Sequence, residues 1–110
     1  MARLFFIAVN QGNEADARGL FAEDATVVDR GNRHTGGDID GWLAGSVFEP
    51  DVALNVQDDC VEERTVIADV EWTPSGEDTT RLRLRFLRTE TGLIERLVLR
   101  RAEGPLGCRE

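Results

Sequence analysis

The 110-residue sequence contains no lysine and no tyrosine, and it has a single histidine. Without lysine the chain cannot form a Schiff base with a carbonyl substrate. Without tyrosine it has no phenol that could donate a proton to a substrate oxygen. One histidine excludes a metal site built from several imidazole ligands. No apolar run approaches the ~20 residues that span a bilayer, so we expect no transmembrane helix.

Basic residues are also scarce relative to acidic ones. The chain has 13 arginines against 21 acidic residues, a formal net charge of −8. This balance argues against binding to nucleic acids or anionic membranes, which normally requires a basic patch. The hydrophobic fraction of 41% and the charged fraction of 31% are typical of a folded globular chain. We expect one domain over residues 1–103 and a flexible C-terminal tail over residues 104–110.

Cys60 and Cys108 lie far apart and belong to no recognisable motif. A chain of this length can bury a core without a disulfide, so we expect two free thiols in a reducing compartment. Near the N-terminus, the six residues Leu4–Val9 are too short for the core of a signal peptide, and no small-x-small cleavage site follows. We therefore expect a buried helix there and a cytoplasmic protein.

The first half of the sequence predicts three helices. The first covers residues 2–11, is apolar nearly all round, and ends at Gly12. Asn13 can cap a second helix that runs to about Ala22. A third helix begins at Asp38 and stops before Pro50. One stripe of the third helix is apolar and consists of Ile39, Trp42, Leu43 and Val47.

Alternating apolar residues indicate strands in the rest of the chain. A strand is expected over residues 25–29, followed by a polar loop over 31–37. Further strands are expected over 52–56, 61–72, 79–88 and 93–101. Helices followed by a run of antiparallel strands predict an α+β fold.

Charge and hydrophobicity together fix one hairpin register. If Val70 pairs with Leu82, apolar side chains meet on one face, and acidic residues meet arginines on the other. The apolar pairs are then Val66–Phe86, Ala68–Leu84 and Val70–Leu82, and the charged pairs are Asp69–Arg83 and Glu71–Arg81. The arginines of the last third are therefore interpreted as partners of strand carboxylates and not as a phosphate-binding surface.

The register of the last strand stays open. Pairing Phe86 with Ile94 sets Glu95 against Arg85, which is favourable, but it places Arg96 beside Leu84 on the apolar face. A buried arginine requires a carboxylate partner. Either Arg96 has a special role or this register is wrong.

Several segments resemble the nuclear-transport-factor-like superfamily. The stretch Val9–Asn13 (VNQGN) is similar to the end of its first helix, and Leu20–Val27 (LFAEDATV) is similar to its entry into the first strand. Gly36 and the helix that carries Trp42 resemble a third segment. The likeness is closest to SnoaL-like polyketide cyclases and ketosteroid isomerase. It implies a cone in which a strongly curved mixed or antiparallel sheet wraps around helices and encloses an apolar pocket, and a homodimer formed through the sheet.

The same resemblance places Asp29 where the isomerase has its general base. A carboxylate in an apolar pocket is a stronger base because its charged form is disfavoured, and ketosteroid isomerase has carboxyl groups tuned in this way. The other isomerase groups are not found. Phe5 occupies the position of its tyrosine, and Leu82 to Leu84 stand near the position of its second aspartic acid. The loss of each oxyanion donor costs about 10²–10³ in rate, so ketosteroid isomerase activity is not expected.

Each candidate functional residue also has an interpretation as a purely structural residue. Asp29 could instead be a strand-end carboxylate paired with Arg30 or Arg33. His34 is a weak candidate for a proton shuttle, because it lies in a polar loop without a nucleophile beside it. The acidic cluster of residues 58–63 fits no metal-binding loop, and no metal or cofactor is expected. Candidate pocket-lining residues are Phe5, Val27, Trp42, Trp72, Leu82, Leu84 and Arg96.

Two functions are compatible with these observations. One is a SnoaL-like binding domain that holds a small hydrophobic ligand without turnover, as a homodimer. The alternative is an isomerase, cyclase or hydrolase in which Asp29 acts as general base on a small hydrophobic carbonyl or epoxide substrate. The surroundings of Asp29 distinguish the two: an enzyme requires a carboxylate that faces a pocket, whereas a binding protein tolerates an arginine partner.

Overall fold

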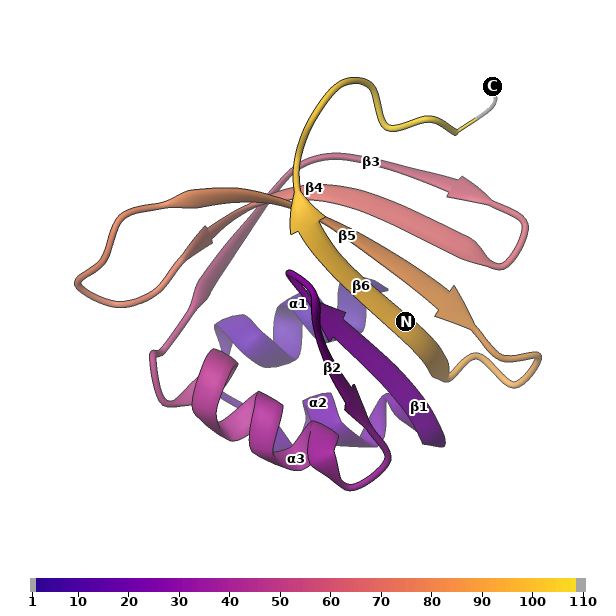
Figure 1. The fold of residues 1–110 in the computed structure, drawn as a ribbon, viewed down its shortest axis with the longest axis horizontal. Helices are drawn as coiled ribbons and strands as arrows, with labels where there is room; N and C mark the ends of the chain where they lie inside the picture. Colours follow the sequence, from indigo (N-terminus) through magenta and orange to yellow (C-terminus); the bar gives the residue numbers. More distant parts are fainter. Residues whose placement is uncertain (1, 109–110) are drawn as a thin grey trace.

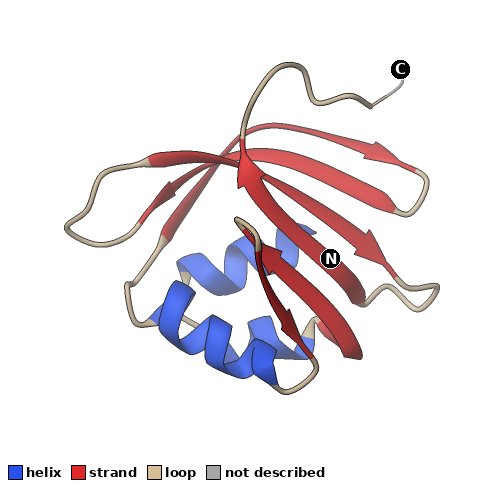
Figure 2. Ribbon diagram, in the orientation of Figure 1, coloured by secondary structure: helices blue, strands red, loops and turns tan. Residues whose placement is uncertain are grey.

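The computed structural model describes residues 2–108, which form one curved sheet packed on helices (Figures 1 and 2). The strand order in the sheet is β2-β1-β6-β5-β4-β3, with β1 and β6 parallel and every other pair antiparallel. The elements in chain order are α1 (Ala2–Asn10), α2 (Glu14–Gly19), β1 (Phe21–Asp29), β2 (Asn32–Thr35), α3 (Asp38–Trp42), the π-helical segment η1 (Leu43–Phe48), β3 (Ala53–Glu62), β4 (Thr65–Thr73), β5 (Thr80–Arg88) and β6 (Ile94–Arg101). This is the α+β class expected from the sequence.

The helices follow the expected signals with one exception. Gly12 adopts a φ of 68°, which suits the residue that ends a helix. The Asn13 side chain accepts a hydrogen bond from the backbone N–H of Asp16 at 3.1 Å, so the predicted N-cap is confirmed. The prediction that α2 reaches Ala22 is wrong, because α2 ends at Gly19 and β1 begins at Phe21. Sheet pairing with β6 overrides the helical pattern there.

The predicted polar loop over residues 31–37 is also wrong in part. Residues Asn32–Thr35 form β2, which pairs with β1 through a two-residue turn. Both turn residues, Arg30 and Gly31, have positive φ angles of 49° and 94°. These angles are typical of the type I′ turn that joins tight hairpins.

The central hairpin has the predicted register. Val70 pairs with Leu82, Ala68 with Leu84 and Asp69 with Arg83. The strand expected over residues 61–72 is divided, because β3 ends at Glu62 and a tight turn at Glu63, with a φ of 54°, precedes β4.

Of the two possibilities left open for the last strand, the structure shows that the Phe86–Ile94 register does not occur. Phe86 pairs with Leu97, not with Ile94, and an irregularity in the pairing lies next to Arg88. Both Ile94 and Leu97 are therefore buried, although they are three positions apart. Glu95 and Arg96 are both exposed, so neither points into the core.

One core fills the concave side of the sheet. Four phenylalanine rings meet edge to face around Phe5, with ring centroids 5.6–6.2 Å apart. Such contacts are favourable beyond the burial of area alone. Asn10 ties α1 to β3, because its side-chain amide both donates to the carbonyl and accepts from the N–H of Leu54. The four stripe residues predicted for the third helix are all buried in this core.

The expectation of free thiols is overturned. Cys60, near the end of β3, forms a disulfide with Cys108 in the C-terminal segment, with Cα atoms 6.2 Å apart. The two residues are 48 positions apart, and nothing in their local sequence indicates the pairing. The disulfide fixes the end of the described chain to the sheet.

Candidate functional site

Asp29 is a buried carboxylate with two side-chain partners. It is 7% exposed and is the one charged or polar residue in the buried class among residues 2–108. The indole Nε1–H of Trp42 donates to its Oδ2 at 2.9 Å. The guanidinium of Arg30 donates to Oδ1 at 2.7 Å and to Oδ2 at 3.3 Å. Both carboxylate oxygens therefore have hydrogen-bond partners.

Arg30 shields Asp29 from the solvent. It is the first residue of the type I′ turn, its backbone N–H donates to the Leu99 carbonyl, and its guanidinium lies 5.9 Å from the Trp72 ring centroid. Its side chain is 45% exposed and borders an open hollow that Trp72 also lines. A substrate entering from this hollow would meet the guanidinium before the carboxylate. The alternative interpretation of Asp29, as a strand-end carboxylate paired with Arg30, describes this geometry.

His34 lies in β2, opposite Val27 of β1. It is half-buried, and its ring centroid is 6.4 Å from that of Trp42. This places the imidazole close to the indole that binds Asp29. His34 is thus near the carboxylate through Trp42 and belongs to the packing around it.

Six of the seven predicted pocket-lining residues lie in the packed core. Their exposures are 0–2%; Trp72 touches the hollow beside Arg30, and the other five have almost no surface that water can reach. They are Phe5, Val27, Trp42, Trp72, Leu82 and Leu84. Side chains thus fill the part of the cone in which the isomerase-like pocket was expected. The seventh, Arg96, lies on the opposite face of the sheet.

An apolar groove opens at the mouth of the cone, between α1 and the β3–β4 hairpin. Its volume is about 490 Å³. Ile7, Val56 and Val61 are 44%, 39% and 67% exposed there. The groove is lined by Ala2, Arg3, Phe6, Ile7, Asn10, Val56, Asp59, Val61 and Val66. Sequence patterns did not reveal it, because these residues are spread over α1, β3 and β4.

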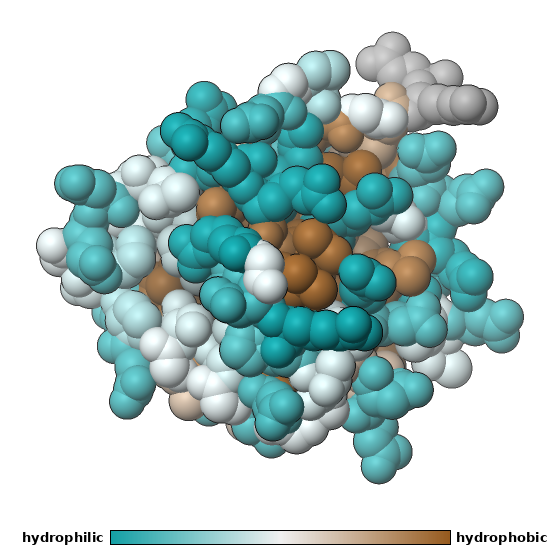
Figure 3. Space-filling view, in the orientation of Figure 1, coloured by the Kyte–Doolittle hydropathy of each residue, from teal (hydrophilic) through white to brown (hydrophobic). Residues whose placement is uncertain are grey.

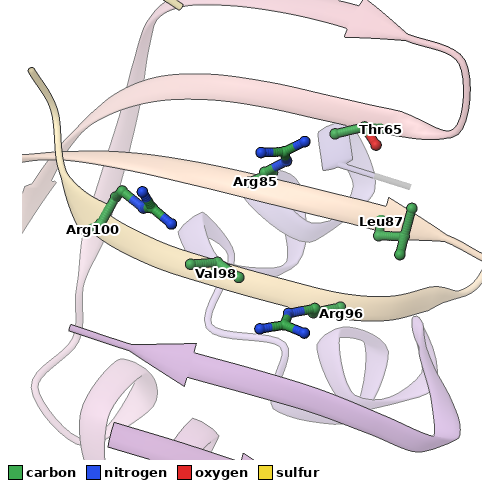
Figure 4. Close-up of a pocket in the computed structure, with 6 residues that line it drawn as sticks. All are labelled: Thr65, Arg85, Leu87, Arg96, Val98 and Arg100. Atoms are coloured by element: carbon green, nitrogen blue, oxygen red, sulfur yellow. The ribbon is translucent and has the colours of Figure 1, made fainter. Parts of the chain in front are cut away.

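The outer face of the sheet carries a second hollow of about 300 Å³, between β4, β5 and β6 (Figure 4). Leu87 and Val98 form its apolar part, and the guanidinium groups of Arg85, Arg96 and Arg100 surround Val98. None of these three arginines is in an ion pair with another described residue. Figure 3 shows hydrophobic surface framed by hydrophilic side chains on the face that it views.

Residues 2–108 offer neither a clustered metal site nor a membrane-spanning helix. No group of three or more histidine, cysteine, aspartate or glutamate side chains there could hold a metal ion. No helix in this range is long and apolar enough to cross a membrane.

Comparison with solved structures identifies the fold. A protein of Sinorhizobium meliloti described as a "putative polyketide cyclase" has a TM-score of 0.80 at 20% identity, covering 90% of this chain and 92% of its own. A "putative ketosteroid isomerase" from Kribbella flavida has a TM-score of 0.77 at 22% identity, covering 99% and 82%. A Mycobacterium tuberculosis protein in complex with estradiol-17beta-hemisuccinate has a TM-score of 0.76 at 11% identity, covering 89% and 88%.

Other matching structures are described as NTF2-like and SnoaL-like proteins of unknown function. The chain therefore has the NTF2-like, SnoaL-like fold that the sequence resemblance indicated. No family model and no curated protein matches the sequence. At these identities the likeness establishes the fold alone, and a fold of this kind supports many functions.

Proposed function

We propose that this protein is a small-molecule-binding protein that holds an apolar ligand in the groove between α1 and the β3–β4 hairpin. The observation that carries the proposal is the groove itself, which has about 490 Å³ of space and exposed apolar side chains. Ligand sites of proteins have volumes of roughly 300–1,000 Å³ and are mostly apolar. Asn10 and Asp59 also line the groove and supply polar groups that can orient a ligand. The steroid complex of the mycobacterial neighbour supports this class of ligand.

We propose further that the protein has no ketosteroid isomerase activity. A general base needs a free lone pair that faces the substrate. Both oxygens of Asp29 accept hydrogen bonds, from Trp42 and Arg30, and Arg30 separates the carboxylate from the nearest hollow. Phe5 and Leu84, near the positions of the two oxyanion donors, have no polar side-chain atoms and are fully buried.

Titration with Nile red tests ligand binding. This dye is uncharged, so the arginines of the outer face do not attract it. We expect binding by the wild type, competition by a neutral steroid, and at least tenfold weaker binding by Val61→Asp. Val61 is 67% exposed, so a carboxylate there leaves the fold intact. Leu93→Asp is the matched control, since Leu93 is 37% exposed and does not line the groove. Equal affinity of the two variants would exclude the groove as the site.

Ketosteroid isomerase activity can be assayed directly. With a β,γ-unsaturated ketosteroid as substrate, we expect the wild type and Asp29→Asn to show the same background rate. Turnover by the wild type that Asp29→Asn abolishes would instead establish the alternative function, with Asp29 as general base.

We also propose a homodimer formed through the outer face of the sheet. Acidic residues Asp69 and Glu71 lie on β4, and arginines lie on the neighbouring β5 and on β6. A two-fold axis in the interface, parallel to the strands and between β4 and β5, would set β4 of one copy, with Glu71, onto the arginine-bearing β5 of the other. Arginine is enriched in protein–protein interfaces, and three arginines line the hollow of Leu87 and Val98.

Sedimentation equilibrium tests the dimer. We expect Arg96→Glu, in the arginine-rich hollow of this face, to weaken association at least tenfold. Arg3→Glu is the control, because it makes the same charge change on α1. Equal weakening by both variants would mean that net charge, and not the outer face, controls association.

A cytoplasmic location is part of the proposal. Five residues of α1 are buried in the core, so this apolar segment is part of the fold. Cell fractionation tests it. In that compartment a disulfide such as Cys60–Cys108 would form only transiently.

A further inference from the structure

The C-terminal segment after β6 crosses the outer face of the sheet. We call residues 102–108 the strap. Figure 1 shows the segment leaving the end of β6 on the side of the sheet away from the helices. The Ala102 N–H donates to the Arg81 carbonyl on β5, and Cys108 is bonded to Cys60 on β3. The strap therefore joins β6 to the far strand of the sheet and lies over β5 and β4.

Arg83 holds the strap at its middle. Its guanidinium donates to both carboxylate oxygens of Asp69, at 2.7 and 3.0 Å. It also donates to the backbone carbonyls of Glu103, Gly104 and Pro105, at 2.8, 2.6 and 3.0 Å. All five N–H donors of the side chain are used. The hydrogen bonds to Asp69 raise the pKa of Arg83 above its ordinary value, so the group stays charged at neutral pH.

The strap covers part of the surface that the proposed dimer would use. Ile67 points to the outer face, opposite Arg85, yet it is only 7% exposed. Ile67 and the strap residue Leu106 border one hollow of about 310 Å³, which shares Arg85 and Arg100 with the arginine-rich hollow of Figure 4. Two sheets that pack face to face are about 10 Å apart. A chain segment lying on one sheet prevents that approach over β3, β4 and β5.

We propose that the strap is a redox-controlled cover for this docking face, and that a second copy of the chain binds there once the strap is released. This inference rests on the proposed dimer. A dithiol reductant transfers two electrons and two protons to the Cys60–Cys108 bond. The S–S bond breaks, two thiols form, and the dithiol becomes a disulfide.

After reduction only non-covalent contacts hold the strap. The three carbonyls that Arg83 binds are in exposed positions, where water replaces a lost hydrogen bond at little cost. Release of the strap frees the N–H groups of Arg83 that donate to the strap carbonyls, and it exposes Ile67 to solvent. The uncovered surface then combines an apolar centre with the arginines of β5 and β6 and with Glu71 of β4. Cytosolic disulfides are commonly transient and redox-sensing, which agrees with this role.

The first experiment compares association of the oxidised and the dithiothreitol-reduced protein by sedimentation equilibrium. We expect at least tenfold tighter dimerisation after reduction. The double variant Cys60→Ser/Cys108→Ser should dimerise like the reduced protein with or without dithiothreitol, and it cannot form disulfides between copies. Equal dimerisation in both redox states would overturn the redox control and leave the dimer standing. Absence of dimers in every state would overturn the proposed dimer itself.

The second experiment follows the strap directly, independently of dimerisation. Methyl NMR with a soluble paramagnetic agent measures how exposed each isoleucine is. At concentrations below dimerisation, we expect the Ile67 methyl signals to be protected in the oxidised protein and strongly broadened after reduction. Ile94, which is fully buried beneath the sheet, is the internal control and should not change. Continued protection of Ile67 after reduction would show that Arg83 alone retains the strap, and the redox cover would be refuted.

Discussion

The hydrogen bond between Trp42 and Asp29 offers the sharpest test of how the buried carboxylate is held. Replacing Trp42 by phenylalanine removes the Nε1–H donor and keeps an aromatic ring in a position that is 2% exposed. Loss of a hydrogen bond to a charged group costs about 1.5–3 kcal/mol. The smaller ring adds a cavity cost of about 1 kcal/mol. We therefore expect Trp42→Phe to lower the free energy of unfolding by roughly 2.5–4 kcal/mol.

Trp72→Phe is the matched control. Trp72 is equally buried, and its indole makes no side-chain hydrogen bond among the described residues. Its replacement should cost the cavity and the weakened contact with Arg30, together about 2 kcal/mol. Urea unfolding followed by fluorescence measures both variants, since each keeps one tryptophan.

A double-mutant cycle separates the bond from the cavity. In the Asp29→Ala background, Trp42→Phe should cost only the cavity, which gives a coupling energy of about 1.5–3 kcal/mol. A coupling below about 0.5 kcal/mol would refute the reasoning, because the indole would then contribute through its volume alone. The ion pair between Arg30 and Asp29 contributes little to the free energy of unfolding. The Arg30 side chain is 45% exposed, and pairs that solvent screens contribute no more than about 1 kcal/mol.

Three further predictions concern stability. Leu84→Ala, at a fully buried position between β4 and β6, should cost about 3–5 kcal/mol in urea unfolding. Asn13→Ala, which removes the cap of α2, should cost about 1 kcal/mol in the same assay, and no change would mean that the cap does not form in solution. Reduction of the Cys60–Cys108 disulfide should lower the free energy of unfolding by up to about 4 kcal/mol, because it closes a loop of about 49 residues in the unfolded chain. A melting temperature independent of dithiothreitol would contradict that disulfide.

Local sequence signals predicted those parts of the fold whose causes are local. The cap at Asn13 and the helix end at Gly12 depend on neighbouring residues only. The β4–β5 register was predictable because one pairing satisfied both the apolar and the charged face. The register of β6 was not predictable, because Ile94 and Leu97 are three positions apart and both face inward. In a regular strand, side chains three positions apart point to opposite faces of the sheet. The irregularity in the strand pairing near Arg88 allows both side chains to face inward.

The candidate site was harder to predict, because a pocket wall and a core residue have the same composition. Whether Trp42 and Phe5 enclose space or fill it depends on how rings from distant segments meet. Here Phe5 contacts rings from α1, β1 and β5 at once, and the space is filled. The disulfide was missed for a related reason. Cys108 lies in a segment without regular structure, so no periodicity indicates which strand it reaches.

The turn after β1 explains why an isomerase-like segment need not imply an isomerase. The aspartate that follows VV in this strand is kept, but the next residue is an arginine in a conformation that favours asparagine or glycine. A non-glycine residue with positive φ typically costs about 1 kcal/mol or more, so the side chain of Arg30 must compensate. It does so by binding both oxygens of Asp29 and by lying against Trp72. A catalytic base requires the opposite arrangement. No cation is bound to its carboxylate, and the substrate has an open path to that carboxylate. The turn sequence, more than the presence of the aspartate, therefore favours binding over catalysis in this chain.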